Sequence, residues 1–177
     1  CAMIRFGVTL RSLTLPEGLS ESLLVKDVRH ALKQFNAALE GIVEFRVEQW
    51  PESDYRVFIE FGEADEGTAE LVKDANGKDF TVKLDPRADW DLKKRWFMRF
   101  GAVSTVTLIM HELAHIAQFA HEAYEDSILY ARPFPRRHLT REDAVMLRLI
   151  FRQWAAQQGR EDMSIQNSNG NEAGRLV

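Results

Sequence analysis

The sequence has few of the features that mark several large classes of protein. Cys1 is the only cysteine among 177 residues, so the chain has no internal disulfide and no zinc site built from cysteines. No apolar run approaches the roughly 18 residues that a membrane span needs. The formal net charge is −4 without a basic cluster, which argues against nucleic acid or an anionic membrane as the partner.

The composition is that of one globular domain. Hydrophobic residues make up 45% of the chain and charged residues 28%, both ordinary values. A chain of this length can bury a sizeable apolar core. We expect the domain to span residues 1–158 and to be a monomer. From Gly159 onward the sequence is rich in Ser, Asn, Gly and Gln without periodicity, which predicts a disordered tail over residues 159–177.

The position of Cys1 leaves the cellular compartment open. The cysteine is either a remnant before a native start at Met3, which favours a cytoplasmic protein, or the lipid-bearing first residue of a mature lipoprotein. Strand-like sequence follows at once without a linker, which favours the first interpretation.

Hydrophobic periodicity predicts an α+β fold. Apolar residues spaced three or four apart indicate helices, and alternation of apolar and polar residues indicates strands. Ser20 is the expected N-cap of the first helix, and Thr140 with Asp143 is expected to open the last one. Strands are expected at residues 3–10, 42–50, 55–61, 71–72 and 80–84, helices at 21–39, 102–117 and 140–154, and a loop, with room for a short helix, at 85–100.

Asn76 and Gly77 lie between two short apolar segments, which is a strong signal for a β-hairpin. The surrounding residues 74–79 also carry side-chain oxygens at calcium-like spacing. They do not match the EF-hand loop, which has its glycine one place later. We interpret this stretch as a plain turn and keep Ca²⁺ as the weaker alternative.

Three of the five histidines lie within eleven residues, in the sequence HELAHIAQFAH at residues 111–121. Residues four apart lie on one face of a helix, about 6 Å apart along its axis. His111 and His115 can therefore bind one Zn²⁺ ion, with Glu112 beside a water molecule on the metal. The alternative is a buried helix whose histidines hydrogen-bond to their neighbours. His30 and His138 are isolated in the sequence, and we expect no metal role for them.

His121 can join this site only if the helix ends early. On a continuous helix it would lie about 240° around the axis from His115 and roughly 9 Å further along. The helix must therefore end near Gln118 and the chain must turn back. Pro133 and Pro135 and the loss of periodicity after this point fit such an end.

These residues carry a family resemblance. The pattern HExxHxxQxxH at residues 111–121 resembles the metzincin zinc motif, HExxHxxGxxH. The sequence SILYARP at residues 127–133 resembles the Met-turn of the matrixin branch, and LTRED at residues 139–143 resembles the opening of its last helix. The order of the predicted elements and the length also resemble a matrixin catalytic domain.

The resemblance implies a metzincin-like fold: a mixed twisted sheet, a long first helix, a buried zinc-binding helix and a small C-terminal subdomain. The upper part would span about residues 1–118 and the lower part about 119–158. It implies a zinc-dependent endopeptidase of the secreted or cell-envelope type, with one catalytic Zn²⁺. His111, His115 and His121 would hold the metal, and Glu112 would activate a zinc-bound water.

The resemblance also implies a substrate site. Leu129, Tyr130 and Pro133 would form the floor or wall of a substrate pocket. A protein or peptide substrate would bind in extended form along an exposed sheet edge, for which the strand at residues 80–84 is our candidate.

Two residues depart from the family motif. Gln118 replaces a glycine that ends the zinc helix, at a cost of about 1–2 kcal/mol. Leu129 replaces the methionine of the Met-turn, a swap that conserves volume and costs under about 1.5 kcal/mol. Two alternatives stay open: a zincin of another clan whose third ligand is Glu122, Glu125 or Glu142, and a catalytically silent zincin-like binding module.

Overall fold

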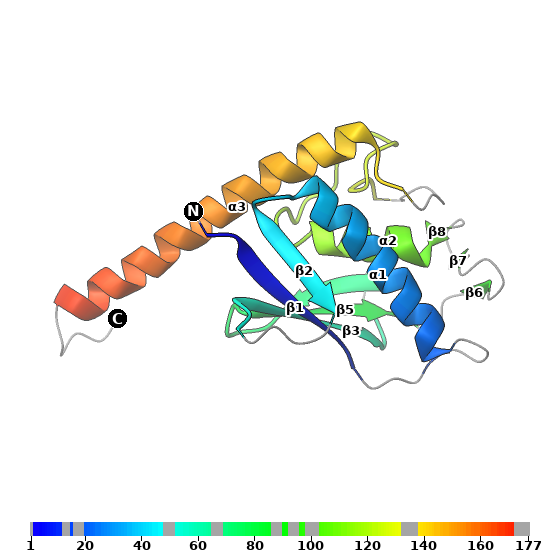
Figure 1. Ribbon diagram of the computed structural model, residues 1–177, viewed down its shortest axis with the longest axis horizontal. Coiled ribbons are helices and arrows are strands. Elements are labelled where there is room, and N and C mark those ends of the chain that lie inside the picture. Colours follow the sequence, from blue (N-terminus) through cyan, green and yellow to red (C-terminus); the bar gives the residue numbers. More distant parts are fainter. Residues whose placement is uncertain are drawn as a thin grey trace.

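The computed structural model describes residues 2–11, 15, 20–47, 52–64, 69–85, 90–91, 96–97, 103–131 and 138–171. The predicted α+β class is confirmed: a mixed five-stranded sheet carries three helices on one face (Figure 1). In chain order the elements are β1 (Ile4–Leu10), α1 (Glu21–Ala38), β2 (Val43–Val47), β3 (Tyr55–Phe61), β4 (Ala69–Lys73), β5 (Asp79–Leu84), β6 (Trp90–Asp91), β7 (Trp96–Phe97), β8 (Val103–Ser104), α2 (Thr105–Ala114) and α3 (Arg141–Asn171).

The strand order of the main sheet is β2-β1-β3-β5-β4. The first four strands in this order run parallel, and β4 pairs antiparallel with β5 through the predicted hairpin, where Gly77 has φ 72°. The strand at residues 80–84 is therefore not an edge strand, and that prediction was wrong. It lies between β3 and β4, and β4 forms the edge. Local pattern cannot decide which strand of a hairpin joins the sheet, because that choice depends on the pairing of β5 with β3.

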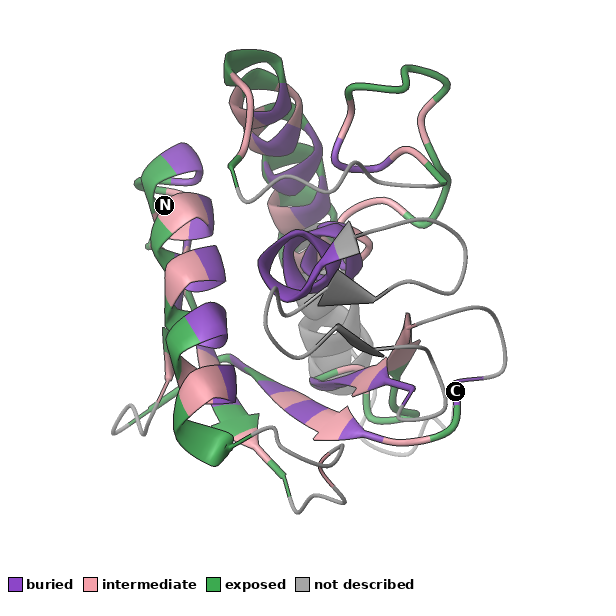
Figure 2. Cartoon of the chain, turned by 90° about the vertical axis from the view of Figure 1, so that its right-hand side faces the viewer, coloured by how far each residue is buried: buried purple, intermediate pink, exposed green. Residues whose placement is uncertain are grey.

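The apolar core lies between the sheet and the helices. Phe6 of β1 stacks on Phe45 and Tyr55, with ring centroids 4.5 and 5.1 Å away, and Trp154 of α3 lies 5.7 Å from it. Burial of one such side chain contributes about 1.5–3 kcal/mol. Figure 2 shows α1 exposed on one side only, as its amphipathic pattern predicts, whereas every residue of α2 is buried.

Two segments differ from their predicted structure. β6 and β7 lie in the stretch expected to be a loop, and they form a second sheet with β8. Strands of two residues are too short to leave a periodic signal. The tail expected to be disordered from Gly159 is helical as far as Asn171, because a helix that packing has nucleated gains one hydrogen bond for each residue added. None of the helices within the described residues has the length and apolarity that a membrane crossing requires.

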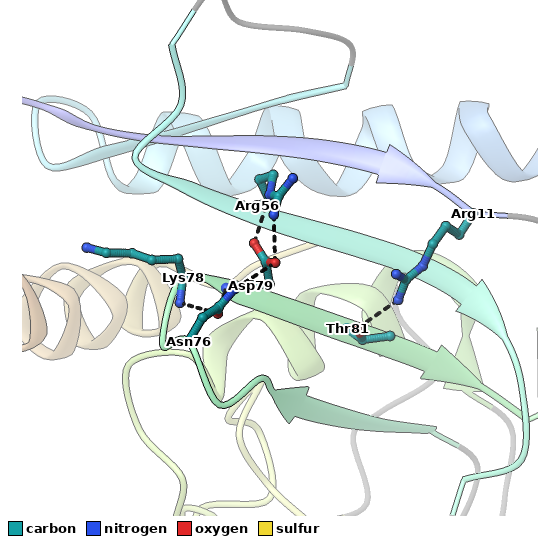
Figure 3. Close-up of polar contacts among 6 residues, drawn as sticks. All are labelled: Arg11, Arg56, Asn76, Lys78, Asp79 and Thr81. Carbon is teal, nitrogen blue, oxygen red and sulfur yellow. Dashed lines mark hydrogen bonds and ion pairs between the residues drawn. The ribbon is translucent and has the colours of Figure 1, made fainter.

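The outer face of the sheet is polar. Arg56 donates two hydrogen bonds of 2.8 Å to the carboxylate of Asp79, and the Asn76 side chain donates a third of 3.0 Å (Figure 3). Asn76 Oδ1 accepts from the backbone N–H groups of residues 78 and 79. The side-chain oxygens of Asn76 and Asp79 considered as calcium ligands are therefore engaged in the turn and an ion pair. Phe58 is an apolar residue on this face, and the guanidinium of Arg11 lies 4.1 Å from the centroid of its ring.

Arg56→Met is expected to destabilise the chain at neutral pH and much less in acid. The hydrogen bond from Arg56 lowers the pKa of Asp79 below its ordinary value. A carboxyl with a lowered pKa stabilises the fold above its unfolded-state pKa of about 3.9, and this stabilisation disappears as the pH falls through the folded-state value. Urea unfolding at pH 7 and pH 3 measures the difference.

Arg46→Met is the matched control, because it removes an arginine from the same face without touching Asp79. A destabilisation by Arg56→Met that is equal at both pH values would contradict the linkage.

Candidate metal centre

Helix α2 carries the first half of the centre. The Ser104 side chain accepts a hydrogen bond of 3.1 Å from the N–H of Thr107 and so caps the helix. The apolar residues that follow bury α2 on all sides, which places His111 and Glu112 inside the molecule with relative exposures of 4% and 5%. His115 is the C-cap residue and is half-buried.

Two backbone carbonyls determine the proton positions on the first two histidines. Nδ1 of His111 lies 2.6 Å from the carbonyl oxygen of Ile128, and Nδ1 of His115 lies 3.0 Å from that of Gln118. A carbonyl oxygen only accepts hydrogen bonds, so each Nδ1 carries the proton. Both Nε2 atoms then present lone pairs, and they lie 3.2 Å apart.

The end of α2 brings the third histidine to the other two. The helix ends at Ala114. The N–H groups of residues 115–117 donate to carbonyls three residues back, which makes a tighter turn than an α-helix, and the N–H of Gln118 donates to the carbonyl of Ala114. The chain then turns, as predicted. The ring of His121 lies 5.4 Å from that of His111 and 5.0 Å from that of His115. One nitrogen from each histidine lies within 4.8 Å of the others, so the three can hold a metal ion.

A buried turn at residues 128–130 lies beside the centre. Ile128 and Leu129 are fully buried, and Tyr130 is half-buried. The carboxylate of Asp143 accepts hydrogen bonds from the N–H groups of Ile128, at 2.8 Å, and Thr140, at 3.0 Å. Asp143 thus joins the start of α3 to the carbonyl group that orients His111.

The carboxylates considered as alternative third ligands do not join the cluster of histidines. Within the described ranges, the three histidines form the one group of three or more potential metal ligands. The Glu122 carboxylate accepts a hydrogen bond from Gln118, Glu125 is exposed, and Glu142 lies in the first turn of α3. Pro133 lies outside the described residues.

His30 and His138 are isolated in the sequence, but their rings lie 5.8 Å apart in the structure. His30 is on α1, and the residue after His138, Leu139, bonds through its N–H to the α1 side chain of Gln34. The two histidines therefore meet because the segment before α3 packs on α1. This contact joins residues far apart in the sequence, and no local pattern signals it.

Burial favours the neutral forms of His111, His115 and Glu112 in the metal-free chain. It lowers the pKa of His111 to about 3, against the opposing effect of the Ile128 carbonyl, and it also lowers the pKa of His115. It raises the pKa of Glu112 to about 8, to which the charge of Glu70 adds. Neutral imidazole is the form that ligates metals. The Glu112 carboxyl lies 3.9 Å from Nε2 of His111, close enough to serve as a proton acceptor or donor beside a bound ion.

Comparison of the chain with protein-family models and with curated protein sequences gives no match.

Proposed function

We propose that this protein is a metzincin-like zinc endopeptidase, with Zn²⁺ held by His111, His115 and His121. The observation that carries the proposal is the 3.2 Å separation of the Nε2 atoms of His111 and His115. Two nitrogens bound to one tetrahedral zinc at about 2.0–2.1 Å lie about 3.3–3.4 Å apart. The separation of the two atoms therefore fits zinc ligation without rearrangement of α2.

A hydrogen bond between the two rings is the competing explanation for this separation. One Nε2 would then carry a proton, so the Nδ1 atom of the same ring would lose its own. That ring would direct a lone pair at a carbonyl oxygen 2.6 or 3.0 Å away. Such a contact between two acceptors is unfavourable in a buried site. A cation between the two Nε2 atoms leaves both carbonyl hydrogen bonds intact.

Glu112 is the acid–base group of the proposed reaction. Zn²⁺ held by the three histidines would supply the Lewis acidity that activates water and polarises the peptide carbonyl. The Glu112 carboxylate accepts the proton of the attacking water and then delivers it to the leaving amine. Its position on α2, one residue after His111 and 3.9 Å from that ring, supports this role. Burial keeps bulk water from competing for the proton.

Strand β4 is the proposed docking edge for an extended peptide substrate. The sheet has two edges, β2 and β4. At β2 the Asn36 side chain already bonds to both backbone groups of Phe45, at 2.8 Å each. β4 has no strand partner on its outer side among the described residues, and it packs next to α2. A peptide that adds to β4 would run past the metal centre, with Leu129 and Tyr130 at the floor of its pocket.

Metal analysis and a cleavage assay test this proposal together. We expect one zinc per chain in protein purified without added metal, and cleavage of an unfolded protein substrate that a chelator abolishes and Zn²⁺ restores. Zinc binding without cleavage would leave a zincin-like binding module instead of an enzyme. Absence of zinc binding would refute both.

A further inference from the structure

Gln118 contacts the chain on both sides of His121. Its side-chain nitrogen Nε2 donates hydrogen bonds to the carbonyl oxygen of Ala120, at 3.1 Å, and to the carboxylate of Glu122, at 2.9 Å. A carboxamide nitrogen carries two N–H groups, and both are used here. The acceptors belong to the residues immediately before and after His121. Gln118 therefore holds the short segment that presents this histidine, and we call its two side-chain hydrogen bonds the bracket.

The same residue also contacts a second histidine of the cluster. Its backbone carbonyl orients His115. On the far side of the bracket, the N–H of Glu122 donates to the carbonyl oxygen of Leu129 at 2.9 Å, one residue from the carbonyl group that orients His111. The bracket is thus anchored to the buried turn beside the centre, and displacement of the His121 backbone away from the other two histidines would strain or break these bonds.

We propose that Gln118 is a positioning residue whose carboxamide holds His121 in place as the third metal ligand. This inference rests on the proposed metal site. His121 needs such a device more than its partners do, because it is exposed and lies after the helix end, whereas His111 is buried on α2. An exposed ligand on a free segment must lose conformational freedom each time it binds metal. The bracket orders the segment before the ion arrives, which is preorganisation of a ligand.

Gln118→Met is the direct test, because methionine has a similar length and no N–H donor. The dissociation constant for Zn²⁺, measured on the full chain against a chromophoric chelator, is expected to rise about tenfold. The visible absorption of bound Co²⁺ is expected to move towards that of His121→Ala, a change that altered folding alone would not produce. Equal zinc affinity in Gln118→Met and the unaltered chain would overturn the proposal.

The double variant Gln118→Met/His121→Ala separates positioning from a general effect on the site. If Gln118 acts through His121, removal of its carboxamide changes zinc affinity no further once His121 is absent. A second tenfold loss in the His121→Ala background would overturn the proposal, since Gln118 would then act through another ligand.

Two Glu122 variants keep the proposal testable if Gln118→Met does not fold. Glu122→Gln retains an acceptor for the Gln118 side chain and should bind zinc about as tightly as the unaltered chain. Glu122→Ala removes the acceptor and should bind more weakly, by a factor approaching ten. Equal affinity in the two variants would count against the bracket. If the unaltered chain binds no zinc, the proposed function itself fails; if it binds zinc and the bracket variants bind equally well, only the role of Gln118 fails.

Discussion

Glu112→Gln is expected to retain one zinc per chain and to reduce kcat for peptide cleavage by about 10²–10⁴-fold. That range is the usual contribution of a positioned general acid–base group. Glutamine has almost the shape of glutamate but cannot accept the proton of the attacking water. The fold should tolerate it, because burial raises the pKa of Glu112 to about 8 and the carboxyl is therefore mainly neutral at pH 7 in the metal-free chain. A neutral amide resembles that form.

Glu125→Gln is the matched control for this experiment. It makes the same chemical change at an exposed glutamate four residues beyond His121, and we expect cleavage at the unaltered rate. Zinc content and thermal unfolding should be measured on both variants. Persistent cleavage by Glu112→Gln would remove Glu112 from the reaction, and loss of zinc would assign it a part in holding the metal.

Local structure was largely predictable from the sequence. The first helix was expected at residues 21–39 and spans Glu21–Ala38, with the Ser20 side chain accepting from the N–H of Leu23 at 3.2 Å. Strand β3 occupies the predicted residues 55–61. Both depend on apolar periodicity and end signals, which act over a few residues. Such information is present in any short window of the chain.

Features that depend on distant contacts were not predictable. The interior position of β5 follows from its pairing with β3, and the extension of α3 to Asn171 follows from nucleation by its packed first half. In both cases the deciding interaction joins segments that no single window contains. The amino-acid composition of the last segment therefore predicted disorder, although the packed turns of α3 that precede it favour a helix.

In the candidate site, too, residues with a local sequence pattern were predictable and residues that act through distant contacts were not. His111 and His115 could be predicted because metal ligands at helical spacing leave a pattern in the sequence, and His121 because the stretch resembles a known zinc motif. The groups that orient them were missed. Ile128 lies 17 residues beyond the His111 ring that it orients, and Asp143, expected only as a helix cap, lies 15 residues beyond Ile128. Gln118 entered as a costly replacement for glycine, and its side-chain contacts with Ala120 and Glu122 became visible only in the folded turn.

His121→Ala is expected to weaken zinc binding by about 10²–10³-fold without unfolding the chain. Structural zinc sites bind with about 10–16 kcal/mol from four ligands, or about 2.5–4 kcal/mol for each, and each 1.4 kcal/mol changes the dissociation constant tenfold. The fold should survive because His121 is exposed and lies outside the core. Competition with a chromophoric chelator measures the loss, which should far exceed that of Gln118→Met because a ligand is removed rather than loosened.

Two controls decide whether the loss belongs to ligation by His121. His138→Ala removes another exposed histidine, one outside the cluster, and should bind zinc with unchanged affinity. Glu125→Ala tests the rival third ligand and should also bind normally. If Glu125→Ala releases the zinc and His121→Ala retains it, the third ligand is a carboxylate. The chain would then belong to another type of zincin, and the bracket around His121 would not position a metal ligand.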